Sequence, residues 1–330
     1  MRPFIYRLLC ILASFAIFGS SLFASPLNSK LLSLVPPGAE IVAGFENHPG
    51  GHKCGRLLLS THNDRIDLDD WQALAGVDNK RVVDEVIEVA ATSSIGRLTE
   101  HLLLVGGRFD KERIFSAAEL NGAEKSEFEG LALIVIQPFA REENEMLDKR
   151  WLVILDDRIA MFGTESMVQR ALRRYQSHAT IDMALMERLS QMPSDVSSWN
   201  VLVAPKIEKS LSLTQPNSLL AQLIDGAEVL MVGTRFGSTV RVDFLLHARS
   251  DQATGLLNQK ASAFADMFAK GRFQQSGPSP QRRGESLSVD ADRVHGSVEL
   301  SAKEFEEWNE LGGFTRSLQG PVLHNPGHGE

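Results

Sequence analysis

Short apolar segments with strand-like spacing recur along the chain and are separated by turn residues. Alternating apolar and polar positions, or a short apolar run bounded by Gly, Pro, Asn or Asp, are typical of β-strands. Turn residues at 156–158 and 236–238 predict two hairpins. Residues 131–136 are apolar throughout, so we expect this strand in the middle of a sheet and not at its edge. The predicted strands span residues 40–45, 56–60, 82–90, 101–109, 131–136, 151–155, 159–163, 199–204, 227–235, 239–248, 286–289 and 294–300.

Segments with helical periodicity lie between these strands. Asp110 is a typical N-cap and Asn121-Gly122 is a typical left-handed helix end, so the apolar positions between them predict a helix. Thr164 is expected to cap a second helix, which has its apolar side chains on one face. The longest predicted helix spans residues 251–270. Shorter helices are predicted at residues 31–34, 67–77, 218–224 and 302–310.

The order of these elements divides the chain into two similar halves, residues 25–180 and 181–311. Each half reads β-α-β-β-α-β-β-α, which is close to the β-α-β-β-α-β order of ferredoxin-like folds. The sequence therefore predicts an α+β protein with two ferredoxin-like halves, whose antiparallel sheets are covered by helices and which meet near residues 178–197. Residues 312–330 have no periodicity and predict a disordered tail.

Residues 1–24 have the pattern of a secretory signal peptide. Arg2 and Arg7 precede an apolar run, and Ala24 stands just before Ser25-Pro26. The run is near the lower limit of about 17 residues for spanning a bilayer, so an uncleaved membrane anchor is the alternative. We therefore expect a periplasmic or secreted protein, or one that is anchored by this N-terminal segment. No other part of the chain is expected to contact a membrane.

Composition is ordinary for a folded soluble protein. Hydrophobic residues make up 43% of the chain and charged residues 23%, which excludes a disordered chain and a polytopic membrane protein. The net charge of −8 becomes −10 without the leader, so nucleic acid is not an expected partner. Cys10 lies in the leader and Cys54 is then the single cysteine. No internal disulfide is expected, and the core must depend on burial.

The residues best suited to bind a metal lie in one Gly-rich loop. His48, His52 and Cys54 offer two imidazoles and a thiolate within a short stretch, and His62 follows. Zinc prefers these donor groups, but their spacing matches no standard zinc motif. A solvated loop that happens to contain histidines is the alternative interpretation. His48, His52 and Cys54 are therefore weak metal candidates, and no other cofactor is expected.

The other residues with reactive or charged side chains are explained by structural roles in the fold. The chain has no Gly-x-Ser-x-Gly, Ser-x-x-Lys or His-Glu-x-x-His motif and no phosphate-binding loop, so no catalytic residue is predicted. Adjacent acids such as Asp156-Asp157 point to different faces and cannot share a proton. We interpret Arg170, Arg173 and Arg174 as a solvated helix face. His247 is interpreted as a solvent-facing or hydrogen-bonded strand residue.

Three segments resemble uncharacterised exported bacterial proteins that are common in acidobacteria. They are LLSLVPPGAEIVAGF, EHLLLVGGRFDKERI and WLVILDDRIAMFGTESMVQRAL. In these families a strand that ends in Gly-Arg-Phe-Asp leads into a helix, and a leucine-aspartate turn, an apolar strand and Gly-Thr lead into another. The resemblance covers roughly residues 30–310. It implies export and an architecture. The shared motifs are turns and helix caps, so no site residue and no function are implied.

Together these features predict an exported, non-catalytic envelope protein that acts as a binding or assembly module for an unknown envelope protein or ligand. One alternative is a metal-dependent hydrolase that uses the loop with His48, His52 and Cys54. Another is a small-ligand or lipid binder that uses a cleft between the halves. Metal analysis of the purified mature protein separates the hydrolase from the other two hypotheses.

Overall fold

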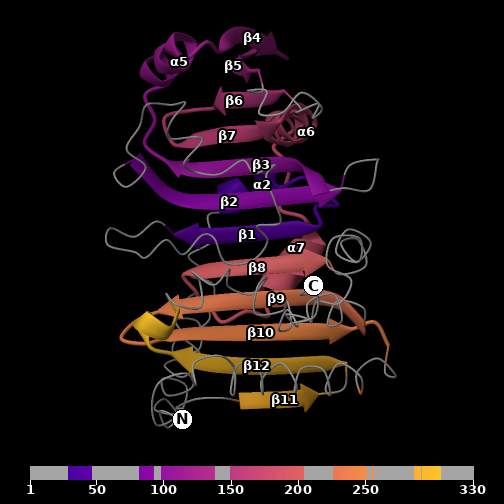
Figure 1. Cartoon of the computed structure of the whole chain (residues 1–330). Helices are drawn as coiled ribbons and strands as arrows, with labels where there is room; N and C mark the ends of the chain where they lie inside the picture. Colours follow the sequence, from indigo (N-terminus) through magenta and orange to yellow (C-terminus); the bar gives the residue numbers. More distant parts are fainter. Residues whose placement is uncertain are drawn as a thin grey trace, which may run out of the picture.

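Twelve strands in the described part of the chain form one continuous antiparallel sheet, which extends from one end of the molecule to the other (Figure 1). The structure is a computed structural model that describes residues 29–46, 82–92, 98–137, 149–203, 226–250, 255, 286–290 and 292–305. The strand order is β11-β12-β10-β9-β8-β1-β2-β3-β7-β6-β5-β4. The strands are β1 (Ile41–Glu46), β2 (Val83–Thr92), β3 (Leu98–Gly107), β4 (Glu124–Phe128), β5 (Leu131–Ile136), β6 (Arg150–Ile154), β7 (Ile159–Thr164), β8 (Ser198–Val203), β9 (Ala227–Phe236), β10 (Val240–Ala248), β11 (Ser286–Asp290) and β12 (Arg293–Leu300). The helices are α2 (Ser29–Leu34), α5 (Lys111–Leu120), α6 (Glu165–Gln176) and α7 (Met183–Leu189).

The two halves of the chain are joined edge to edge within this sheet. β1 pairs with β2 on one side and with β8 on the other, and Gly44 lies directly opposite Trp199 in the β1–β8 pair. Outward from this seam the order is β1-β2-β3-β7-β6 in the first half and β8-β9-β10-β12-β11 in the second. The described strands of the two halves therefore follow corresponding orders, with β3 equivalent in position to β10.

The predicted α+β class and the antiparallel pairing are confirmed, but the described strands do not form two separate ferredoxin-like sheets. A β-α-β crossover places its two strands parallel. Here β1 and β2 pair antiparallel as direct neighbours, and so do β8 and β9. Periodicity along the sequence does not detect the pairing of β1 with β8, because the two strands are far apart in the chain.

Every predicted strand that falls on described residues is present, although two details differ. Residues 131–136 form β5, which lies second from an edge and not in the middle of the sheet. Its outer side is covered by β4, a strand that the sequence analysis did not predict. Helix α7 was not predicted either. The leader, the tail, the strand at 56–60, the helices at 67–77 and 218–224, and all of 251–270 except Gly255 lie outside the described residues.

Local signals account for both ends of α5, but the predicted cap at the start of α6 is not formed. The Asp110 side chain accepts a hydrogen bond from the Arg113 N–H at the start of α5, and Gly122 after its end has a φ of 86°, as predicted. Thr164 is the N-cap residue of α6, but its hydroxyl makes no capping bond. It donates instead to the backbone oxygen of His101 at 3.3 Å, so it ties β7 to β3.

Asp156 closes the predicted turn between β6 and β7. Its Oδ1 atom accepts hydrogen bonds from the backbone N–H groups of Arg158 and Ile159, each at 2.8 Å. Its Oδ2 atom lies 2.8 Å from Lys30 Nζ, which belongs to α2. Burial raises the pKa of Asp156, but the Lys30 bond and the two N–H groups outweigh burial and lower it overall. The carboxylate therefore stabilises the turn and ties it to α2.

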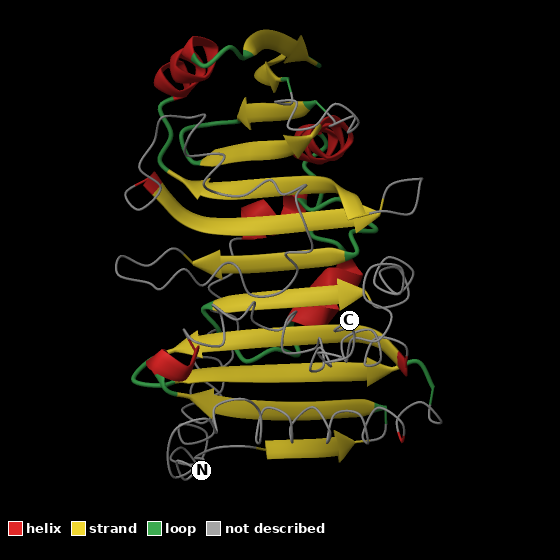
Figure 2. Cartoon of the chain, in the orientation of Figure 1, coloured by secondary structure: helices red, strands yellow, loops and turns green. Residues whose placement is uncertain are grey.

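Two apolar cores cover opposite faces of the first half of the sheet. Directly opposed residues of an antiparallel pair point to the same face, and Gly44, Ile87, Leu104 and Met161 follow one another in such a row. This face, called the α6 face below, carries the core that includes residues of α2, α6 and α7 (helices red in Figure 2). The other face, the α5 face, carries the core that includes residues of α5. None of the helices within the described ranges is long and apolar enough to cross a membrane.

Candidate functional site

The α6 face changes character from one end of the sheet to the other. Over the first half and β8 it is mainly apolar and packs against α2, α6 and α7. Over β10 and β12 it is mainly polar, while the alternate residues of these strands, which point to the α5 face, are buried and apolar. The polar side chains on the α6 face of β9 to β12 are called the C-terminal polar surface: Arg235, Arg241, Asp243, His247, Ser286, Ser288, Asp290, Arg293, His295, Ser297 and Glu299.

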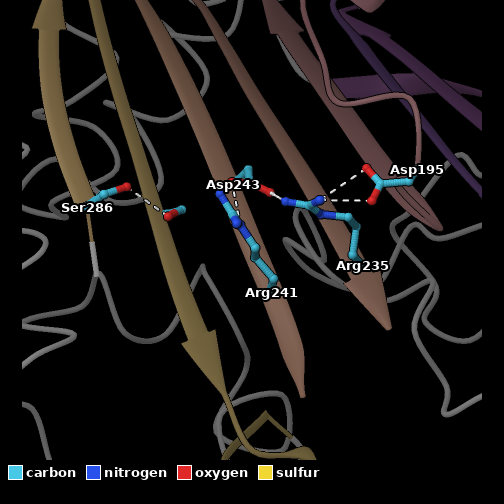
Figure 3. A network of polar contacts seen from close by, with 6 residues as sticks. Asp195, Arg235, Arg241, Asp243 and Ser286 are labelled. Carbon is cyan, nitrogen blue, oxygen red and sulfur yellow. Dashed lines mark hydrogen bonds and ion pairs between the residues drawn. The ribbon is translucent and has the colours of Figure 1, made fainter. Parts of the chain in front are cut away.

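A buried carboxylate organises this surface (Figure 3). The Asp243 side chain is 4% exposed, and each of its oxygens accepts a hydrogen bond from an arginine. Arg235 Nη2 lies 2.8 Å from Oδ2, and Arg241 Nε lies 3.0 Å from Oδ1. Arg235 Nη1 also donates to both carboxylate oxygens of Asp195, at 2.8 and 3.1 Å. One guanidinium thus links β9 and β10 to the segment before β8.

The strand register explains why a carboxylate is needed at position 243. Arg241 lies directly opposite Arg235 in the β9–β10 pair, and like charges in that arrangement repel each other. Asp243 is two residues further along β10 on the same face. One of its carboxylate oxygens binds the Arg235 guanidinium and the other binds the Arg241 guanidinium. The hydrogen bond with Asp195 is the largest effect on the pKa of Arg235 and raises it, and the bond with Asp243 also raises it. Both acids therefore favour the charged arginine.

Arg241 is the charged group of this surface that is best placed to meet a partner. Its side chain is 47% exposed, and Asp243 holds it through Nε. Its terminal nitrogens have no partner among the contacts of the described residues. Glu299 lies directly opposite on β12, and its carboxylate accepts a hydrogen bond from the Thr239 hydroxyl. A guanidinium fixed at Nε can still donate through its terminal nitrogens to a carboxylate of a ligand.

The segment after α7 limits the open part of this surface. Gln191 Oε1 lies 2.7 Å from His247 Nε2. Further along the segment, Val196 packs over Gly233 of β9, where an added Cβ would lie 2.7 Å from Val196 Cγ1. Asp195, beside Val196, makes the ion pair with β9 described above. In the described part of the chain this segment covers β8 and β9, whereas no helix covers β10, β12 and β11 on the α6 face (Figure 2).

Protonation of His247 is expected to destabilise the folded protein. Burial, followed by the positive charge of Arg293, holds the pKa of His247 below its usual value. Asp292 and Glu228 act in the opposite direction, and Arg188 adds to the lowering. An unfolded histidine titrates near about 6.5. As the pH falls through that value, the unfolded state binds more protons than the folded state, so stability is lost.

Urea unfolding at about pH 7.5 and about pH 5 measures this effect. Carboxylates elsewhere also contribute to acid destabilisation, so the comparison is between the unchanged protein and His247→Gln. We expect the unchanged protein to lose more of its free energy of unfolding between the two pH values than the variant does. Equal losses in the two proteins would show that His247 titrates as an ordinary exposed histidine.

The predicted metal candidates lie outside the described residues. This applies to His48, His52 and Cys54 and to His62, so the structure does not test whether they converge. Among the residues that it does describe, no group of three or more His, Cys, Asp or Glu side chains is placed to hold a metal ion.

The arginines of α6 have structural partners. Arg170 Nη2 lies 3.1 Å from Glu100 Oε2 on β3. Arg174 Nε donates to the backbone oxygen of Ser33 in α2 at 2.7 Å. Arg173 pairs with the acidic residue that follows β4. These contacts hold α6 against its neighbours, which accounts for the basic cluster without a ligand.

The Asp243 network was missed by sequence reasoning. A partial signal exists, because Arg241 and Asp243 alternate with apolar residues in β10 and so indicate a polar face on a half-buried strand. The contact between Asp195 and Arg235 has no such signal, since the residues are separated by 40 positions. The register between β9 and β10, together with the path of the segment after α7, brings these side chains together.

No family model matches the sequence, and no curated protein matches it. A comparison of folds finds a solved structure titled "Structure of crystal form I of TP0453", with a TM-score of 0.43 and 8% sequence identity. The alignment covers 86% of this chain and 98% of that chain.

Proposed function

We propose that this is an exported, non-catalytic envelope protein that works as a binding or assembly module, and that the C-terminal polar surface is its binding surface. In this proposal residues 1–24 direct export, and the mature chain acts in the periplasm or outside the cell. Retention of these residues as an N-terminal anchor is the alternative. We further propose that residues 25–180 and 181–311 are two versions of one architectural unit, which is supported by their corresponding strand orders.

The proposal rests on the change of the α6 face from apolar at one end of the sheet to polar at the other. The α6 face is mainly apolar and covered by helices over the first half of the sheet, but it is mainly polar over β10, β12 and β11, where Asp243 holds Arg241 in a half-exposed position. Arginine is enriched at protein interfaces, and a side chain held in place loses less entropy on binding. Small-molecule sites are typically concave and apolar. A partner protein with an acidic group therefore suits this surface best.

Reversal of the Arg241 charge tests the proposal. The mature chain and its Arg241→Glu variant are produced in the envelope of the native cell, cross-linked in place and recovered, and the attached proteins are identified by mass spectrometry. We expect a specific envelope partner, recovered at least about tenfold less with the variant, because truncated or reversed hot-spot arginines cost 2 kcal/mol or more. Arg113→Glu on α5 is the matched control, since Arg113 is also exposed.

Two results would contradict the proposal. One is equal recovery of the partner with Arg241→Glu and with the unchanged chain, which would place binding elsewhere. The other is robust turnover of a substrate by the purified mature protein in broad hydrolase and redox screens, which would make it an enzyme. Thermal melts of both variants show whether a loss of binding reflects a loss of folding.

A further inference from the structure

We propose that the protein self-associates through strand β4, which pairs antiparallel with β4 of a second copy across a two-fold axis. β4 is the last strand in the sheet order, and among the described strands it pairs only with β5 (top of Figure 1). Its first four residues are exposed and the fifth is half-buried. An edge strand presents a row of backbone N–H and C=O groups that can pair with another strand.

The charge pattern of β4 is complementary to itself. Antiparallel pairing centred on Ser126 places Lys125 opposite Glu127 of the second copy, and Glu127 opposite Lys125 of that copy. Opposite charges in directly opposed positions stabilise a sheet, and like charges destabilise it. Ser126 is also the middle residue of β4, so this register pairs the whole strand in both copies.

The surroundings of Lys125 and Glu127 support the same register. Both side chains lie on the α5 face, because Lys125 is directly opposite Ile134 of the core on that face. Lysine on an edge strand usually discourages pairing. Here Lys125 Nζ lies 2.7 Å from Glu119 Oε2 of α5, an exposed ion pair that leaves the lysine able to meet a second carboxylate. Nothing in the described part of the chain pairs with the Glu127 carboxylate, which a lysine of the second copy would neutralise.

The backbone restricts the contact to this one strand. Gly122 and Gly130, on either side of β4, have positive φ angles of 86° and 81°, so the chain turns away at both ends. A five-residue strand in each copy buries less than the roughly 1,200 Å² of a stable interface. We therefore expect a weak dimer in which one sheet continues through both copies.

Sedimentation velocity of the mature chain over a concentration series tests the proposal. We expect a shift from monomer to dimer in the range of about 10 μM to 1 mM. Lys125→Glu and Glu127→Lys each place like charges opposite one another twice in the dimer, and each should weaken dimerisation at least about tenfold. The double variant Lys125→Glu/Glu127→Lys restores opposite charges and should dimerise like the unchanged chain.

Recovery in the double variant separates a specific register from a general effect of charge on solubility or folding. Circular dichroism melts check that each variant is folded. A monomer at every concentration overturns the proposal. So do single variants that dimerise like the unchanged chain, or a double variant that remains monomeric while folded.

Discussion

Replacing Gly44 with alanine is expected to lower the free energy of unfolding by about 2–3 kcal/mol. Gly44 lies in β1 directly opposite Trp199 of β8, at the seam between the two halves. A Cβ at position 44 would lie 2.4 Å from Cε2 and Cζ2 of the Trp199 ring. Trp199 is 2% exposed and belongs to the core on the α6 face. The ring cannot move away without disturbing that core.

Chemical unfolding of Gly44→Ala measures this loss, and Gly255→Ala provides the matched control. An added Cβ at Gly255 has no atom within 4 Å. Gly255 has no left-handed φ that alanine would strain, and the added side chain lowers the entropy of the unfolded chain, which is worth about 0.4–1 kcal/mol. We therefore expect the control to be neutral or slightly stabilised. A Gly44→Ala protein as stable as the control would mean that Trp199 does not cover β1 as described.

Replacing Asp243 with asparagine is expected to lower the free energy of unfolding by about 2–3 kcal/mol. The change removes the charge that separates two directly opposed arginines, Arg235 and Arg241. Removal of one partner from a fully buried ion pair typically costs 3–5 kcal/mol. We expect less here because the two arginine side chains are 25% and 47% exposed and solvent screens part of their charge.

The matched control for this network is Asp195→Asn. Asp195 binds the same guanidinium, but its side chain is 64% exposed, so its loss should cost about 1 kcal/mol or less. Urea unfolding midpoints at neutral pH compare the two variants. If both variants lose the same small amount of stability, Asp243 is not the group that organises the C-terminal polar surface.

The sequence predicts the local parts of this fold well. Hairpins, strands and the ends of α5 depend on residues close together in the chain, such as Asp110 and Gly122, and these elements are present where expected. The sequence does not predict β4, because an edge strand need not alternate apolar and polar residues. The residues of β4 are mostly polar and exposed. The sequence does not predict the pairing of β1 with β8 either, since no local pattern specifies which distant strand becomes a neighbour.

The candidate surface is predictable to a smaller extent. The alternation in β10 indicates one polar face, which the structure places on the α6 face. Whether Asp243 is buried, and which arginine it meets, depends on the register between β9 and β10 and on the segment after α7. The histidine loop, which sequence reasoning selected as the sharpest candidate, lies outside the described residues.

The two halves share one sheet through the pairing of β1 with β8. The Glu46 N–H donates to the Ser197 backbone oxygen at 3.1 Å, which makes this a hydrogen-bonded pair of the antiparallel ladder. Such pairs alternate with non-hydrogen-bonded pairs, so Ala43 and Asn200 form one of the latter. Their Cα atoms are then about 4.5 Å apart, within the range that a disulfide can bridge.

The most direct test is disulfide formation between cysteines at these two positions. The mature chain with Ala43→Cys and Asn200→Cys, and with Cys54→Ser to remove the natural thiol, is oxidised under mild conditions and digested without reduction. Mass spectrometry should find the peptides of residues 43 and 200 linked in most molecules. The control pair Ala43→Cys and Val201→Cys points to opposite faces and should stay unlinked. Free thiols at 43 and 200 in the folded protein would contradict the joined sheet.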